Sequence, residues 1–402
     1  MTRGVKNIIA AAVAAALCIV FFYGVYRIHS ENNKELDSLK AGFIYDGDPS
    51  TPYSANFIKA VNSIRNEHGD KVEILERYNV PYEDTQEVID ELAKKGCGII
   101  FTNSYGYGET VKKMADKYPD IEFCEATCDN ANSKPVLKNY HNFMGEIYQG
   151  RYVSGVVAGA KLNELIDKGI ISKSQAMVGF VAAYPVAEVI SGYTAFLMGV
   201  RSQCPSAVMK VKYINTWNNY ALEKAVAQEL IDQGCVIISH HSNTIGSAIA
   251  CENANKSYPV YHVGYNQDMM GVAPRTELTS CRIDWEPYMM AAVEAVLAGK
   301  DIEDKVDGNI NGQDASGGFK EGWVKLTDIN TAAAAQGSKK LAEETIEDFK
   351  EGKVHVFKGN YTGVDPDDPS DTYDLSKEFK ENAKSSAPTF HYVLKDVITV
   401  VE

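Results

Sequence analysis

Basic charge is the first thing that this sequence has little of. Its 402 residues include 40 Lys and Arg against 54 Asp and Glu, which gives a net charge of -14 at pH 7. An acidic chain repels phosphate backbones and supplies no basic stripe for DNA or RNA. We therefore expect no nucleic acid among its partners.

Signatures of phosphate binding and of hydrolysis are also missing. The polar turn at 46–52, after the first predicted strand, has neither the GxxxxGK(S/T) nor the GxGxxG pattern. A histidine does lie next to Ser242, but no G-x-S-x-G elbow surrounds a candidate serine. We therefore predict that the protein is not an enzyme.

The cysteines form no recognisable metal-binding pattern. Cys124 and Cys128 are the nearest pair, but no second such pair with histidines accompanies them, so we expect no zinc site. The Asp-rich segment 365–371 lacks the ligand spacing of a calcium loop. We expect no metal, no cofactor, and mostly buried cysteines with one or two disulfides at most. Seven cysteines lie outside the N-terminal apolar run, so at least one thiol stays free.

Long apolar runs are also scarce, apart from one at the N-terminus. Residues 8–26 are long enough to span a bilayer, and Arg3 and Lys6 precede them, which predicts a signal anchor with the rest of the chain exported. Leu17 stands before Cys18 where a lipoprotein cleavage site needs a small residue, which favours an uncleaved anchor. A cleaved or lipidated form is the alternative.

The length and composition of the chain predict two or three folded domains. Hydrophobic residues make up 45% of the sequence, and no low-complexity tract is long enough to prevent packing. We expect a membrane anchor at 1–29, a tether at 30–40, a first lobe at 41–160, a second lobe at 161–300, and a C-terminal segment at 301–402 that packs on the lobes.

A near-repeat indicates that the two lobes are alike. "ELAKKGCGIIFTNS" at 91–104 returns as "ELIDQGCVIISHHS" at 229–242. In each copy an amphipathic helix ends at a glycine, Gly96 or Gly234, and a short apolar strand and a polar cluster follow. Another helix and strand come next, a series that predicts α/β lobes of the doubly wound, Rossmann-like kind.

The polar clusters after the strands predict the ligand site. In parallel sheets, ligands bind outside the carboxyl ends of the strands, so two facing lobes form one cleft that closes by a hinge. Aromatic, carboxylate and amide side chains gather at these strand ends and suit a planar heterocycle. Tyr45 and Tyr53 have an equally good alternative as packing residues. In the tandem His240-His241, neighbouring side chains point oppositely, so we expect one to pack and one to face the cleft.

The sequence resembles the basic membrane protein family over residues 41–363. The resemblance rests on "FIYDG", "GIIFTNSYGYGETVKKMADKYPDIEFCEAT", "NFMGEIYQGRYVSGVVAG", "KYINTWNN", "VGYNQDM" and "DWEPYMMAAVEAVLAGK". Members are substrate-binding proteins of ABC transporters, and many bind purine nucleosides or bases. The resemblance implies the type I periplasmic binding protein fold, an ABC permease and ATPase as partners, and a small-molecule ligand.

The chain departs from the nucleoside-binding members of that family at three places. Those members carry an Asp where this chain has Tyr45, a Ser-Phe-Asn at the start of the first helix, and a lysine after the Thr-Ser that is here Thr279-Ser280. Several of these groups serve the ribose, so a free base is at least as well supported as a nucleoside. By position the resemblance implies eleven ligand contacts: Tyr45, Tyr53, Trp217 and Trp285 as aromatic walls, Asn103 and Ser104 as base-edge contacts, Glu188 as an acceptor, and His241, Ser242, Asn266 and Asp268 as polar contacts.

These observations predict an extracytoplasmic, membrane-anchored protein that binds a purine-like base or nucleoside for an ABC importer. Two alternatives stay open. The same two-lobed cleft is able to report ligand occupancy to a signalling partner. Its aromatic and carboxylate side chains also suit a sugar.

Overall fold

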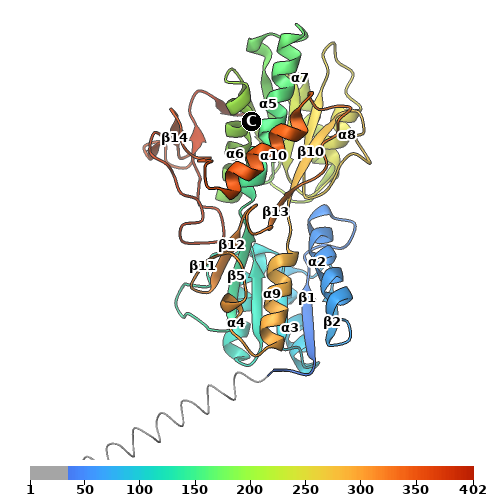
Figure 1. Cartoon of the computed structure of the whole chain (residues 1–402), viewed down its shortest axis with the longest axis vertical. Coiled ribbons are helices and arrows are strands. Elements are labelled where there is room, and N and C mark those ends of the chain that lie inside the picture. Colours follow the sequence, from blue (N-terminus) through green and yellow to red (C-terminus); the bar gives the residue numbers. More distant parts are fainter. Residues whose placement is uncertain (1–34) are drawn as a thin grey trace, which may run out of the picture.

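The computed structural model describes residues 35–402, which form two lobes stacked along the long axis of the molecule (Figure 1). The predicted anchor and residues 30–34 of the tether lie outside the described residues. Within 35–402, no helix has both the length and the apolar character needed to cross a membrane. The helices are α2 (Pro52–His68), α3 (Thr85–Lys94), α4 (Gly108–Lys117), α5 (Ile147–Asp167), α6 (Ala187–Gln203), α7 (Tyr220–Asp232), α8 (Gly246–Glu252), α9 (Glu286–Leu297) and α10 (Ser338–Lys350).

Each lobe is built on a mostly parallel sheet. The first sheet has the order β11-β12-β5-β4-β3-β1-β2, and the second has the order β13-β10-β9-β8-β6-β7-β17. The first sheet comprises β1 (Leu39–Ile44), β2 (Val72–Arg77), β3 (Ile99–Thr102), β4 (Glu122–Ala126), β5 (Tyr140–Gly145), β11 (Asn309–Asn311) and β12 (Asp314–Gly317). The second comprises β6 (Met177–Ala182), β7 (Val208–Tyr213), β8 (Ile237–His241), β9 (Tyr261–Tyr265), β10 (Glu277–Ile283), β13 (Val324–Leu326) and β17 (Ile398–Val400).

The near-repeat occupies the same place in both lobes. Its strand is β3 in the first sheet and β8 in the second, and each pairs in parallel with the first strand of its lobe. Gly96 and Gly234, which follow α3 and α7, have φ of 83° and 95°, so the predicted left-handed helix ends are confirmed. The predicted fold of two doubly wound α/β lobes is therefore confirmed.

The chain crosses between the lobes three times, at 145–147, 283–286 and 317–324. This differs from the predicted boundaries near 160 and 300. Helix α5 belongs to the second lobe because it packs along α6, and α9 belongs to the first because it packs on α2. A sequence pattern defines each helix but does not say which of two adjacent sheets the helix covers.

Glycines set the close packing of α5 against α6. A Cβ at Gly155 would lie 2.1 Å from the carbonyl oxygen of Phe196, and one at Gly199 would lie 2.0 Å from that of Tyr152. Both distances are far below van der Waals contact, so only glycine lets the two backbones approach this closely. This contact anchors α5, which leads from the first crossing into the second lobe.

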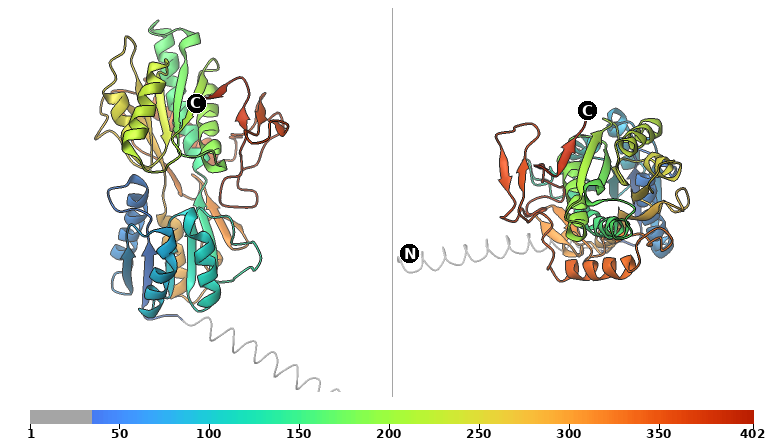
Figure 2. Two further views of the ribbon diagram at one scale, coloured as in Figure 1. Left: turned by 180° about the vertical axis from the view of Figure 1, so that it is seen from behind. Right: turned by 90° about the horizontal axis from the view of Figure 1, so that it is seen from above.

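The C-terminal segment differs from its prediction in one respect. The sequence at 339–357 predicts a final helix and strand. Helix α10 forms there, but residues 353–357 form no strand, and Phe357 stacks on Phe390 with ring centres 4.3 Å apart. Three short strands, β14 (Thr362–Val364), β15 (Thr372–Asp374) and β16 (Val393–Leu394), make a separate small sheet. Strand β17 then joins the edge of the second sheet beside β7, so this segment lies on the flank of the second lobe (Figure 2).

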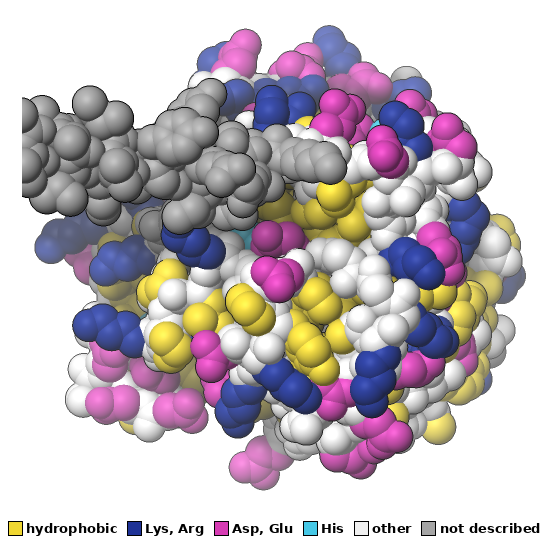
Figure 3. Space-filling model, turned by 90° about the horizontal axis from the view of Figure 1, so that it is seen from below, with side chains coloured by type: hydrophobic (Ala, Val, Ile, Leu, Met, Phe, Trp, Pro, Cys, Tyr) yellow, Lys and Arg dark blue, Asp and Glu magenta, His cyan; other side chains and the backbone are white. Residues whose placement is uncertain are grey.

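The cysteines and the charges of the described residues have simple arrangements. All seven cysteines in 35–402 are buried free thiols, so the expected burial is found and these residues form no disulfide. At the end of the first lobe, Lys and Arg side chains alternate with Asp and Glu and with scattered hydrophobic ones (Figure 3). That face therefore carries no field of a single sign.

The glycine contact between α5 and α6 predicts that a Gly→Ala substitution, which usually stabilises a helix, destabilises the protein at this position. In an exposed helix, Gly→Ala stabilises by about 1 kcal/mol. We expect Gly199→Ala to destabilise by about 2 kcal/mol instead, because the new methyl group forces the helices apart. Gly271→Ala is the control, since a Cβ there meets open space. Urea unfolding of both variants measures the effect, and equal stabilities would contradict the packing argument.

Candidate functional site

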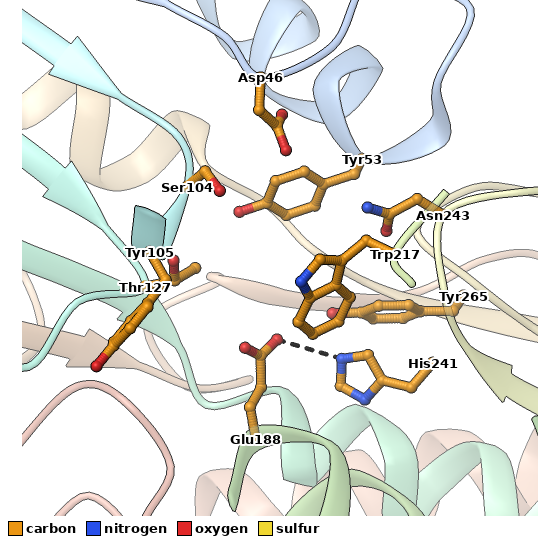
Figure 4. A pocket seen from close by; sticks show the side chains of 10 residues that line it. All are labelled: Asp46, Tyr53, Ser104, Tyr105, Thr127, Glu188, Trp217, His241, Asn243 and Tyr265. Carbon is orange, nitrogen blue, oxygen red and sulfur yellow. Dashed lines mark hydrogen bonds and ion pairs between the residues drawn. The ribbon is translucent and has the colours of Figure 1, made fainter. Parts of the chain in front are cut away.

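A cavity lies between the lobes at the carboxyl ends of the strands. Its volume is about 50 Å³, room for roughly three to five water molecules. Side chains from both lobes converge on it (Figure 4). The lining residues are Asp46, Tyr53, Ser104, Tyr105, Thr127, Glu188, Trp217, His241, Asn243 and Tyr265.

Asp46 supplies a carboxylate from the first lobe, directly after β1. The Asn103 amide nitrogen donates to its Oδ1 over 3.2 Å, and the Ser54 hydroxyl donates to the same oxygen over 3.3 Å. The backbone N–H of Asp46 donates in turn to Asn103 Oδ1 over 3.0 Å. Burial raises the pKa of the Asp46 carboxyl, and the hydrogen bonds from Asn103 and Ser54 oppose that rise. The carboxyl is thus held in one orientation at the cavity wall.

Tyr53 and Ser104 complete the wall of the first lobe. The Tyr53 hydroxyl donates to the backbone oxygen of Asn103 over 2.6 Å, and Ser104 shares a hydrogen bond of 2.9 Å with Tyr82. Burial, and then the carboxylates of Asp46 and Glu188, raise the pKa of Tyr53 well above its ordinary value. The Tyr53 phenol therefore remains neutral at physiological pH, and its only proton is already donated to the backbone.

Glu188 supplies a second carboxylate from the opposite lobe, in the first turn of α6. Its Oε1 lies 3.2 Å from Nε2 of His241, the last residue of β8 (Figure 4). Burial, and then the charge of Arg151, lower the pKa of His241, while Glu188 acts against that shift. His241 is therefore neutral at physiological pH and has one ring proton to place.

Aromatic rings form much of the second-lobe wall. The Trp217 ring centre lies 6.2 Å from that of His241 and 5.5 Å from that of Tyr184, and the His241 ring lies 4.6 Å from Tyr265. Flat rings with few directed polar groups select flat ligands. None of the ten lining residues is Lys or Arg, and two are carboxylates. The cavity therefore suits a small, flat ligand that presents hydrogen-bond donors toward both lobes.

The two lobes touch directly beside the cavity. Asn56 on α2 donates its amide to the backbone oxygen of Asn266 over 2.7 Å, and both residues are buried. Asn266 follows β9 and has a positive φ of 69°, a conformation that asparagine tolerates better than most residues. This contact holds the cleft closed around the cavity.

A family model described as "ABC transporter substrate-binding protein PnrA-like" matches residues 38–356. The chain belongs to this family. Residues 357–402, which include the small sheet, lie beyond the match.

Known relatives agree with the assignment to the PnrA-like family. A purine-binding protein from Brucella abortus is 33% identical over 326 residues, which cover 80% of this chain and 84% of that protein. A putative ABC transporter glucose-binding protein from Haloferax volcanii is 27% identical over 216 residues, or 54% of this chain and 50% of that protein. A solved ABC transporter solute-binding protein from Aeropyrum pernix has a TM-score of 0.62 at 15% identity, covering 83% of this chain and 95% of that one. The last likeness concerns the fold alone.

Five of the eleven contact residues implied by the family resemblance line the cavity. They are Tyr53, Ser104, Glu188, Trp217 and His241. Asn103 is not on the wall, but it orients Asp46. The expectation that one histidine of the tandem packs and the other faces the cleft is also met, since His240 is fully buried and stacks on His262 at 5.3 Å.

The structure places the other five implied residues away from the wall. Tyr45 hydrogen-bonds Glu76, Ser242 donates to Glu223 over 2.7 Å, and Trp285 stacks on Phe57 with ring centres 4.1 Å apart. Asn266 contacts the first lobe through its backbone, and the carboxylate of Asp268 accepts from the N–H of Met270. Tyr45 thus packs, the alternative that was left open for it.

Five lining residues were missed: Asp46, Tyr105, Thr127, Asn243 and Tyr265. Asp46, Asn243 and Tyr265 are each the chain neighbour of a residue that was named. Successive side chains of a strand point to opposite faces, so a shift of one residue exchanges wall for core. Asp46 also supplies a carboxylate next to the position where the nucleoside-binding members have Asp and this chain has Tyr45.

Ser242, Glu223 and His240 form a buried group outside the cavity wall. The Ser242 hydroxyl donates to the carboxylate of Glu223 over 2.7 Å, and Nδ1 of His240 lies 3.3 Å from the same hydroxyl oxygen. Glu223 also accepts from the backbone N–H groups of Thr244 and Ser247 where α8 begins. These contacts stabilise the start of that helix.

One cluster in 35–402 brings potential metal ligands together. Ligand atoms of Asp365, Asp371 and His391 lie within 4.8 Å of one another, in the small C-terminal sheet and away from the cavity. Asp371 is exposed, and no lining residue of the cavity takes part. We assign no ion to it.

The Asn56–Asn266 hydrogen bond predicts how one substitution changes the opening of the cleft. Asn56→Ala removes about 1 kcal/mol of net stabilisation from the closed form, which should raise the ratio of open to closed molecules roughly fivefold. Small-angle X-ray scattering of the ligand-free protein should show a larger radius of gyration. Asn62→Ala, an exposed position on the same helix, should leave it unchanged. Identical scattering from both variants would contradict a closing role for Asn56.

Proposed function

We propose that this protein captures a purine base in the cleft between its lobes, closes on it by a hinge motion, and delivers it to an ABC permease with its ATPase. The observation that carries the proposal is the pairing of Asp46 and Glu188. These two carboxylates come from opposite lobes and line the same small, aromatic-walled cavity.

The chemistry of purine bases matches this wall. Purines carry ring and exocyclic N–H donors at separate edges of a flat ring system, and carboxylates are acceptors for such donors. Tyr53, Trp217 and Tyr265 offer ring surfaces for stacking. The relative from Brucella abortus, named as a purine-binding protein, supports the same ligand class.

The size of the cavity favours a base over a nucleoside. A volume of about 50 Å³ is smaller than either ligand, so the lobes must move apart on binding, and a base needs the smaller movement. The chain also lacks the lysine that nucleoside-binding members carry after Thr279-Ser280. The family resemblance implies that several of the groups missing from this chain contact the ribose, so the absence of this lysine also favours a base. A sugar is the second candidate, because a relative is named as a putative glucose-binding protein and because stacked aromatics with carboxylates also bind sugars.

The proposed location is the outer face of a membrane, with residues 8–26 as an anchor. The support is the length and apolar character of that run and the preceding Arg3 and Lys6. An anchor of this kind keeps the binding lobes close to the permease that they serve.

Ligand identity is tested by thermal unfolding of the protein with purine bases, nucleosides, pyrimidines and sugars. A ligand at 100 times its Kd adds about 2.7 kcal/mol of stability and raises the Tm visibly. We expect adenine or guanine to raise the Tm and their nucleosides to raise it less. Tm shifts with sugars alone would overturn the purine proposal in favour of the second candidate.

Two variants connect the ligand to the proposed wall. Asp46→Asn and Glu188→Gln keep the shape but lose the charged acceptor, which should weaken base binding about tenfold or more. Asp268→Asn is the matched control, because that carboxylate lies off the wall and accepts from its own loop. Calorimetric titration gives the three Kd values, and equal values would contradict the proposed contacts.

Membrane attachment is tested by fractionation of cells that produce the full chain or a chain exported without residues 1–29. The full chain should sediment with membranes and resist extraction by high salt, since the anchoring is apolar. The shortened chain should remain in the supernatant. Salt-released full-length protein would contradict a spanning anchor.

A further inference from the structure

One buried charge near the cavity has no ionic partner in the described structure. Arg151 on α5 is fully buried, and no Asp or Glu of 35–402 lies within ion-pair distance of it. Its Nη1 donates to the backbone oxygen of His240 over 2.9 Å, while Nε and Nη2 have no hydrogen-bond partner among residues 35–402. Burying an unpaired charge costs several kcal/mol. A buried charge that costs stability in this way suggests a role in function rather than in folding.

Arg151 lies directly behind the wall of the cavity. The guanidinium carbon is 3.8 Å from the ring centre of Tyr265, which is a stacking distance, and Tyr265 lines the cavity. The charge is therefore separated from the ligand space by one aromatic ring.

Both Arg151 and His241 approach the backbone of Gly192, where no side chain stands between them. A Cβ at this position would lie 2.8 Å from Nδ1 of His241 and 3.7 Å from Nε of Arg151, and both nitrogens are buried and unpartnered. One is an obligate donor, because a guanidinium has no lone pair to offer. The other is an acceptor whenever the imidazole carries its proton on Nε2.

That tautomer is the one that Glu188 requires. His241 Nε2 lies 3.2 Å from Glu188 Oε1, so a proton on Nε2 is donated to the carboxylate. The positive charge of Arg151 disfavours a second proton on the ring. The imidazole then stays neutral, and its Nε2–H donates to the Glu188 carboxylate.

We propose that Arg151 is a positioning residue for the ligand site. It keeps His241 neutral with its proton on Nε2, and His241 thereby orients the Glu188 carboxylate as an acceptor in the cavity. The proposal rests on the proposed function in one respect, namely that Glu188 contacts the ligand.

The sign of the pH effect follows from the groups around His241. Glu188 on α6 favours protonation of the ring, Arg151 on α5 opposes it, Tyr265 on β9 stays neutral, and His240 precedes it on β8. Without Arg151, His241 takes up a proton at a higher pH than before. The imidazolium then neutralises Glu188, so binding weakens as the pH falls.

The test compares adenine binding at pH 6.0 and pH 8.0 in the full chain. Wild-type affinity should change less than twofold, whereas Arg151→Met should lose about tenfold in affinity on going to pH 6.0, because His241 then takes up a proton within this pH range. Arg151→Lys retains the charge and should restore the flat profile. Arg201→Met is the matched control, since Arg201 also contacts a tyrosine, Tyr361, but lies far from the cavity. A flat profile for Arg151→Met would overturn the proposal.

A second measurement needs no ligand. The Cε1–H signal of His241, assigned by its loss in His241→Gln, is titrated by NMR in the wild type and in Arg151→Met. An upward shift of the His241 pKa in the variant supports the positioning role, and an unchanged pKa overturns it even if Arg151→Met is less stable. If adenine does not bind to any variant, the proposed ligand fails while this titration still decides the role of Arg151.

Discussion

The structure depends on one constraint: two similar parallel sheets are joined so that the carboxyl ends of their strands face each other. Three crossings of the chain tie the lobes together, so neither sheet is able to turn its strand ends outward. Every residue of the cavity wall is a consequence of this arrangement. Asp46 follows β1, Thr127 follows β4, and His241 and Tyr265 end β8 and β9. The near-repeat in the sequence reflects the same arrangement, because each copy contains a strand, β3 or β8, and the loop after it that contributes to the cavity wall.

The electrostatics of the cavity connect recognition to closure. Asp46 and Glu188 lie on different lobes, and both raise the pKa of Tyr53, so both carboxylates face the same poorly solvated space. Burial of the Asp46 carboxylate away from water opposes closure of an empty cleft. A ligand that donates N–H groups to both carboxylates removes that penalty. The Asn56–Asn266 hydrogen bond adds a contact that exists only when the lobes meet. In the proposed function, binding of a ligand with two donor edges and closure of the cleft are therefore one thermodynamic event.

The fold was predictable from the sequence, and about half of the implied site was. Helix periodicity, the glycines at 96 and 234 and the short apolar strands are local signals, and they defined two doubly wound lobes. The side-chain direction at a strand end is not local, because it depends on register against a neighbouring strand. Tyr45 points toward β2 and Asp46 into the cavity. The sequence alone does not distinguish this arrangement from the opposite one, with Tyr45 in the cavity. Periodicity also does not assign α5 and α9 to lobes, since each assignment depends on a tertiary contact, of α5 with α6 and of α9 with α2.

The C-terminal segment adds a further link across the hinge, and it lies outside the region that matches the family. It is fixed to the second lobe by β17, which pairs with β7, and by Glu381, which accepts from Ser191 on α6 over 2.9 Å. The same segment reaches the first lobe, where the backbone N–H of Ser386 donates to the buried Asp314 over 3.0 Å. Asp314 opens β12, three residues before the third crossing, so this contact lies close to the segments that join the lobes. A link next to the crossings restrains relative motion of the lobes less than a link between their facing surfaces, such as the Asn56–Asn266 hydrogen bond.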